Sequence, residues 1–170
     1  MTKAATATAT VRTYPSSVGV PDKNRQAIIA LLNQHLANST DIHSQVKWSH
    51  WNVKGKDFYQ LHLLFDSIAT HIEDHIDTIA ERIAALGGVA NGTVREAAAK
   101  SAIPEADLAA ADGPTILKFL VHNVGHYTNA MRTAVHEAGD LEDDITVDLF
   151  TTITRELDKD LWFIEAHIQS

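Results

Sequence analysis

The feature that most constrains this chain is a long apolar stripe between residues 57 and 86. When residues are stepped at ~100° each, the rotation of an α-helix, the large apolar side chains fall within one sector of about 80°. They are Leu61, Phe65, Ile68, Ile72, Ile76, Ile79, Ile83 and Leu86. A helix of this length extends roughly 45 Å. One stripe along such a rod can be buried only by other long helices, so the chain is predicted to fold as a helical bundle.

Apolar periodicity predicts three further long helices, and no strand pattern occurs. Their ranges are 21–52, 113–139 and 144–168. Thr93 and Glu96 form a capping-box pattern, which predicts a short helix in the long connection 89–113. Four long helices with one long crossover are typical of an all-α, ferritin-like four-helix bundle.

This bundle is expected to cover residues 21–170 as one domain. Residues 1–20 are mostly Ala, Thr and other small residues without periodicity, so they are expected to form a disordered N-terminal tail.

Charge and composition exclude several classes of protein. The chain has 22 acidic and 14 basic residues, a formal charge of −8, and no cysteine. Thiolate metal sites and disulfides are therefore excluded. An acidic body disfavours binding to nucleic acid and attracts cations instead. No apolar run is long enough to span a membrane or to serve as the core of a secretory signal, which favours a cytoplasmic protein.

A polar stripe runs beside the apolar stripe of residues 57–86. With His62 at 0°, Asp66 lies at about 40°, Asp77 at about 60° and Glu81 at about 100°. His62 with Asp66, and Asp77 with Glu81, are pairs at i,i+4 spacing, and each pair can hold an ion. The centres of the pairs lie ~22 Å apart along a straight helix, so one chain cannot bring them together.

An antiparallel copy of the helix, related by a two-fold axis near residue 71, would place each pair opposite the other. Imidazole and carboxylate ligands without sulfur suit iron, zinc or manganese. The spacing alone leaves open a plain solvated face, although Arg82 is the only base near the stripe. The chain contains no Glu-x-x-His motif, which disfavours a di-iron site inside the single bundle.

Several segments resemble the Dps family, the DNA-binding proteins from starved cells, which are bacterial miniferritins. The resemblance rests on Phe58 and on residues 47–55, 61–66, 74–82, 86–90 and 157–165. It implies a homo-dodecameric shell with two dinuclear iron (ferroxidase) centres at each two-fold interface. Fe(II) would be oxidised there, preferably by hydrogen peroxide, and ferric oxide would be stored in the cavity. Zinc would be a substitute metal.

The resemblance also implies roles for individual residues. The ligands would be His50, His62 and Asp66 of one subunit with Asp77 and Glu81 of the partner. A further role is implied for Trp51, next to His50, as an electron donor if a radical formed; a plain interface aromatic is the alternative.

Other acids and histidines have weaker patterns. The resemblance favours Asp143, Asp144 and Asp148 as the lining of an iron-uptake pore at a three-fold axis. The alternative is stabilisation of a helix N-terminus. His71 and His75 have the spacing of a metal-binding pair, but an exposed or cavity-facing pair is the simpler interpretation. His43 is a candidate secondary ligand or an ordinary hydrogen-bonded histidine.

DNA binding is the alternative function. The first twenty residues contain only Lys3 and Arg12 as bases, and no basic extension follows the last predicted helix. We therefore expect weak or absent DNA binding, with association to the nucleoid left open.

Overall fold

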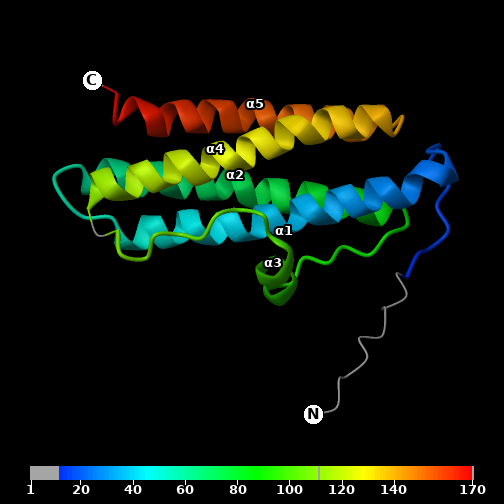
Figure 1. Cartoon of the computed structure of the whole chain (residues 1–170), viewed down its shortest axis with the longest axis horizontal. Coiled ribbons are helices and arrows are strands. Elements are labelled where there is room, and N and C mark those ends of the chain that lie inside the picture. The colour runs from blue at the N-terminus through cyan, green and yellow to red at the C-terminus, as the bar shows by residue number, and fades with distance from the viewer. Residues whose placement is uncertain (1–11, 111, 170) are drawn as a thin grey trace, which may run out of the picture.

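The computed structural model describes residues 12–110 and 112–169, and all five of its regular elements are helices. The long helices are α1 (Asp22–Asn52), α2 (Phe58–Ala85), α4 (Gly113–Asp140) and α5 (Asp144–Ala166); α3 (Val94–Lys100) is short. The long helices lie side by side, whereas α3 projects from the crossover between α2 and α4 (Figure 1). The predicted all-α four-helix bundle is thus confirmed.

The crossover sets the direction of α4. The backbone N–H of Gly113 donates to the carbonyl of Lys54 over 3.2 Å, so α4 begins beside the turn between α1 and α2. Helices α2 and α4 therefore start at the same end of the bundle and run parallel (Figure 1). Helix α1 packs mainly on α2, and α4 mainly on α5. Parallel direction for α2 and α4 requires a connection as long as the bundle, as the sequence predicts.

The core contains the predicted apolar stripe of α2. Leu61 is 1% exposed, and Phe65, Ile68, Ile72, Ile79, Ile83 and Leu86 are fully buried. Ile76 lies at the margin and packs partly against the core. Each buried leucine, isoleucine or phenylalanine contributes about 1.5–3 kcal/mol relative to exposure, so this stripe holds α2 against the rest of the bundle.

Helix ends follow the expected capping chemistry. Thr93 Oγ1 accepts the N–H of Glu96 at 3.3 Å, and Asp112 Oδ1 accepts that of Thr115 at 2.9 Å. These contacts satisfy backbone donors that have no partner inside the helix. Gly87, just after α2, has a φ of 81°, a left-handed conformation that favours glycine.

Residues 14–20, within the predicted disordered tail, make hydrogen bonds to the bundle, and disorder of the tail stays a prediction. Residues 1–11 lie outside the described residues. Tyr14 N–H donates to the carbonyl of Gly87 over 2.8 Å, and Ser16 Oγ to that of Ala85 over 2.7 Å. The guanidinium of Arg25 donates to the carbonyls of Val18 and Val20. These hydrogen bonds, which composition cannot predict, attach the segment to the start of α1 and the end of α2. The domain boundary at residue 20 stays a prediction.

Among the described residues, no helix has both the length and the hydrophobicity needed to cross a membrane.

Candidate metal centre

Two histidines from neighbouring helices form a reciprocal hydrogen-bonded pair. Nδ1 of His50, near the end of α1, lies 2.7 Å from the carbonyl oxygen of His62 on α2. Nδ1 of His62 lies 2.9 Å from the carbonyl oxygen of His50, and the two rings stack with centroids 3.7 Å apart. A carbonyl oxygen only accepts, so each Nδ1 must carry the proton. In the neutral imidazole each Nε2 then carries the free lone pair, the state required of a metal ligand.

Asp66 lies beside this pair on α2. Its Oδ1 is 3.9 Å from Nδ1 of His50 and accepts a hydrogen bond of 2.7 Å from Nζ of Lys47. The hydrogen bond from Lys47 is the main cause that lowers the pKa of Asp66. The carboxylate is therefore held in the ionised form, ready to bind a cation.

Sequence reasoning gave Lys47 no role. Lys47 lies three residues before His50 and therefore shares a face of α1 with it. This spacing was the one sequence feature that could have placed Lys47 near the site.

Asp77 and Glu81 are exposed farther along α2. The one base near them, Arg82, points elsewhere: its guanidinium contacts both carboxylate oxygens of Asp143, at 2.7 and 2.8 Å, and Nε donates to Thr146 Oγ1 over 3.1 Å. Salt bridges with Arg82 therefore do not account for the acidic face of α2.

The predicted ligands thus divide into two groups within one chain. His50, His62 and Asp66 lie near the α1–α2 turn, and Asp77 and Glu81 lie toward the other end of α2. In the part of the chain that the structure describes, no three His, Asp or Glu side chains are grouped so that they could hold a metal ion. The assignment of all five as ligands stays a prediction, and a complete site requires ligands from outside the chain.

The predicted pore acids have different environments. Asp144 and Asp148 are exposed at the start of α5, whereas Asp143 is only 2% exposed. Asp143 caps α5 by accepting the N–H of Thr146 at 3.3 Å, besides binding Arg82. Burial opposes its ionisation, but hydrogen bonds from Arg82 and Thr146 still lower its pKa. Both oxygens of Asp143 are thus occupied, which leaves Asp144 and Asp148 as the acids suited to a pore.

The remaining aromatic and histidine predictions also have definite places. Trp51 is 64% exposed at the end of α1, so it is not a core residue of the single chain. His43 is half-buried on α1; burial is the main cause of its lowered pKa, which nearby Glu73 partly opposes. His71 and His75 contact carboxylates of α5 rather than standing free.

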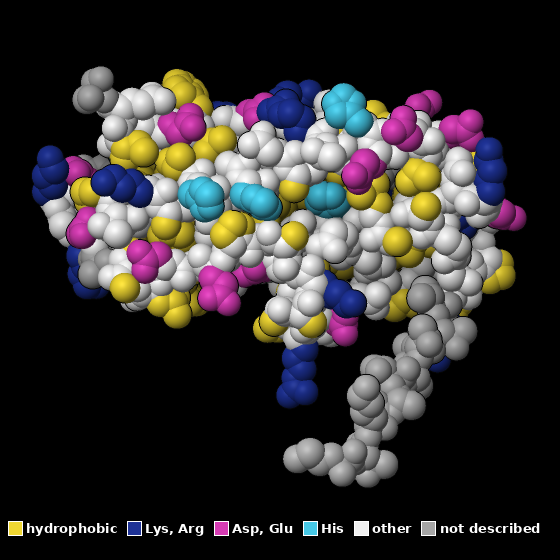
Figure 2. Space-filling view, viewed as in Figure 1, with side chains coloured by type: hydrophobic (Ala, Val, Ile, Leu, Met, Phe, Trp, Pro, Cys, Tyr) yellow, Lys and Arg dark blue, Asp and Glu magenta, His cyan; other side chains and the backbone are white. Residues whose placement is uncertain are grey.

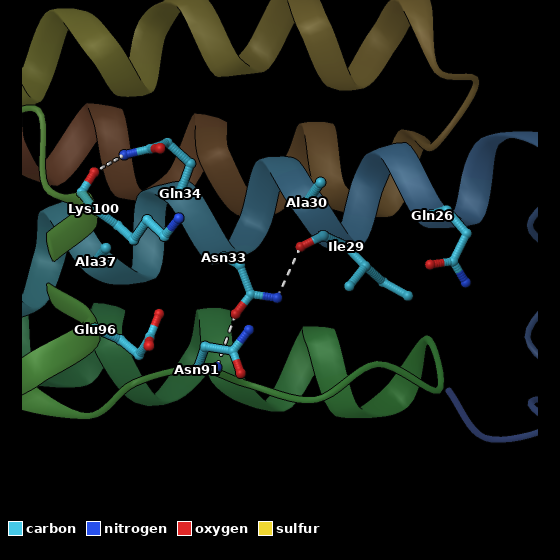
Figure 3. Close-up of a pocket in the computed structure, with 9 residues that line it drawn as sticks. All are labelled: Gln26, Ile29, Ala30, Asn33, Gln34, Ala37, Asn91, Glu96 and Lys100. Carbon is cyan, nitrogen blue, oxygen red and sulfur yellow. Dashed lines mark hydrogen bonds between the residues drawn. The ribbon is translucent and has the colours of Figure 1, made fainter. Parts of the chain in front are cut away.

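A pocket of about 290 Å³ lies between α1 and the crossover, and it offers no comparable ligand set. The Asn33 amide bridges Ile29 of α1 and Asn91 of the crossover, and Gln34 donates to the carbonyl of Lys100 (Figure 3). Glu96 is its one acidic side chain. The amides of this pocket therefore serve to attach the crossover to α1.

Comparisons with known proteins agree with the observed fold. Residues 29–170 match the ferritin-like domain. The DNA protection during starvation protein of Agrobacterium fabrum is 33% identical over 159 residues, covering 94% of this chain and 98% of that protein. DpsA14 from Streptomyces coelicolor superimposes with a TM-score of 0.89 at 33% identity, covering 95% of this chain and 96% of that chain.

A third relative is the Dps protein from Vibrio cholerae, which is described as a member of a broad superfamily of ferritin-like diiron-carboxylate proteins. It superimposes with a TM-score of 0.83 at 26% identity, covering 96% of this chain and 100% of that chain. The chain belongs to the ferritin-like family. Within that family it belongs to the Dps group, as the sequence motifs predict.

The Arg82–Asp143 contact generates a stability prediction. Replacing Arg82 by Met leaves a buried carboxylate without its cation, which should lower the free energy of unfolding by about 3–5 kcal/mol at neutral pH. Lys23→Gln is the matched control, because Lys23 and its partner Glu142 are 74% and 63% exposed; it should cost less than ~1 kcal/mol. Denaturant unfolding measures both values.

The pH dependence of these variants has a definite sign. In the parent protein the lowered pKa of Asp143 stabilises the fold above the ordinary carboxyl pKa and ceases to do so as pH falls through the folded value. Without Arg82, only the hydrogen bonds from Thr146 oppose the effect of burial, so the pKa of Asp143 should rise and the deficit of the variant should shrink as pH falls through the ordinary carboxyl range. An Arg82→Met deficit no larger than that of Lys23→Gln would contradict the assignment.

Proposed function

We propose that this protein is an iron-storing ferroxidase: it oxidises Fe(II) and retains the ferric product inside a shell of identical subunits. The observation that carries the proposal is the His50–His62 pair, which uses both Nδ1 atoms for hydrogen bonds and leaves both Nε2 atoms for a metal, with the ionised Asp66 beside His50. These residues form half of a dinuclear site, and Asp77 and Glu81 of a second chain supply the other half.

The positions on α2 support one register for this pairing. The midpoint of His62 and Glu81 and the midpoint of Asp66 and Asp77 coincide, between residues 71 and 72. One two-fold axis at that point therefore brings both pairs together.

The same register matches large exposed side chains with small ones. It places Leu63, 50% exposed, opposite Ala80 of the second chain. Tyr59, 66% exposed, lies opposite Ala84, which is also exposed. Large side chains facing small ones let two helices approach closely, so this face of α2 is suited to contact with its own copy.

The ligand chemistry suits iron oxidation. Carboxylates favour Fe(III), and two imidazoles allow Fe(II) to bind first. Two Fe(II) ions each give up one electron, and one hydrogen peroxide accepts both electrons with two protons to yield two waters. Pairing the irons thus avoids the single-electron reduction that releases hydroxyl radical, which favours peroxide as the oxidant.

The remaining roles complete the proposal. Asp144 and Asp148 would be repeated around a three-fold axis of a dodecamer and would draw Fe(II) inward. Trp51, next to ligand His50, would donate an electron if a radical formed. Zinc would be a substitute metal for iron at this site.

The central test is complementation between two inactive variants. His62→Ala and Glu81→Ala should each abolish most rapid Fe(II) oxidation. In a mixed dimer, one site carries both substitutions and the other carries neither. Co-assembling the variants at equal ratio should therefore restore about a quarter of the parental sites. Stopped-flow absorbance of ferric iron after peroxide addition measures the recovery.

The matched control mixes His62→Ala with Asp66→Ala, two substitutions in the same half-site. No mixed dimer of this kind has an intact site, so no activity should return. Equal recovery from both mixtures, or none from either, would refute a site divided between chains.

A cross-link tests the register directly. The chain has no cysteine, so an introduced pair reports only on itself. Leu63→Cys with Ala80→Cys should form a covalent dimer on oxidation, because facing Cα atoms fall within the ~7 Å reach of a disulfide. The two positions are ~25 Å apart within one helix, which rules out an internal bond. Leu63→Cys with Thr78→Cys, on another face, is the control and should stay monomeric on a non-reducing gel.

DNA protection is the second candidate, favoured by similarity to the DNA protection during starvation protein of Agrobacterium fabrum. Lys3 lies outside the described residues, and Arg12 is exposed. On the face shown in Figure 2, Lys and Arg side chains are interspersed with Asp and Glu rather than gathered in one patch. With a charge of −8 per chain, we propose that DNA binding is weak or absent near neutral pH.

A mobility-shift assay with duplex DNA at low salt tests this second candidate. We expect little retardation, because phosphate contacts supply most non-specific affinity and this body repels phosphate. Tight binding that weakens steeply with salt would make DNA a main partner after all.

A further inference from the structure

A second group of ligand-type side chains lies between α2 and α5, on a different face of α2 from the candidate iron site. Nδ1 of His71 is 3.0 Å from Oδ2 and 3.1 Å from Oδ1 of Asp160. Nε2 of His75 is 2.9 Å from Oε2 of Glu156. The two helices run antiparallel (Figure 1), so histidines at i,i+4 on α2 face carboxylates at i,i+4 on α5.

Two members of this group are buried without full compensation. Asp160 is 2% exposed, and burial is the main cause that raises the pKa of its carboxyl. His75 is 4% exposed; its Nε2 contacts Glu156, but its Nδ1 is buried with no hydrogen-bond partner. An unpaired buried polar atom destabilises the folded state, so this nitrogen needs an explanation beyond packing.

We propose that His71, His75, Glu156 and Asp160 form a second divalent-cation site, for a borderline transition-metal ion, that joins α2 to α5. Two imidazoles and two carboxylates on facing helices are the ligand set that bundle proteins use for such ions. All four ligands belong to one chain, so the site does not depend on the subunit interface of the proposed ferroxidase.

In this structure the four side chains form two separate histidine–carboxylate pairs. They are not arranged around one point where an ion could bind. One nitrogen of each imidazole, Nδ1 of His71 and Nε2 of His75, faces a carboxylate, and a cation would replace the proton between the two groups. The separations of 2.9–3.1 Å fit this exchange. When two ligand atoms are bound to one ion at ~2.1 Å and their bonds to the ion meet at a right angle, the two atoms lie about 3.0 Å apart. Ion binding would therefore need ring reorientation and proton release rather than movement of the helices.

Co²⁺ is the probe, because its visible absorption reports bound imidazole and carboxylate. The parent protein should bind one more Co²⁺ per chain than His71→Gln/Asp160→Asn, as counted by titration with absorbance. Co²⁺ should also raise the unfolding temperature of the parent more than that of the variant, since the ion links two helices of one chain.

The matched control is His122→Gln/His126→Gln, which removes an exposed i,i+4 histidine pair from α4. It should keep the parental stoichiometry. If Asp160→Asn does not fold, the half-exposed Glu156→Gln provides the test and should weaken Co²⁺ binding at this site by about tenfold or more. Equal Co²⁺ stoichiometry and equal thermal shifts in the parent and the α2–α5 variants would overturn the proposal.

Discussion

The rise of an α-helix, ~1.5 Å per residue, is the constraint on which the rest of this structure depends. It places His62 with Asp66, and Asp77 with Glu81, on one face of α2 but about 22 Å apart. No folding of the single chain removes that distance. The turn at Gly55 brings His50 of α1 to the first pair, while the second pair remains exposed toward solvent. In the proposed function, each group is half of a metal site, and association of two chains completes it.

Helix α2 serves three purposes because its three faces have different chemistry. Its isoleucine face is buried in the core, where it fixes the height and rotation of the helix. Its acidic face remains available because Arg82 is directed to Asp143 at the start of α5. Its third face meets α5 through His71 and His75. Core packing thus positions both polar faces, so side chains far from the candidate ligands still determine where those ligands lie.

The sequence predicts the features that depend on local periodicity. The helices, the Thr93 cap and the buried stripe of α2 follow from spacing along one segment, and the structure agrees with them. The features it missed depend on the register between segments. The Lys47–Asp66 and His71–Asp160 contacts and the attachment of Tyr14 to Gly87 join residues 19 to 89 positions apart. Likewise, the sequence around the start of α5 does not indicate that Asp143 is buried beneath Arg82 whereas the acidic residues next to it are exposed.

The proposed ferroxidase site requires that iron be bound between two chains. Crystals loaded anaerobically with Fe(II) and measured at the iron absorption edge would locate the metal by anomalous scattering. A divided site should give a peak within bonding distance of Nε2 of His62 and of Glu81 of the partner subunit, with Asp66 beside it. An iron peak bound only by residues of a single chain, with Asp77 and Glu81 left in solvent, would contradict the divided site.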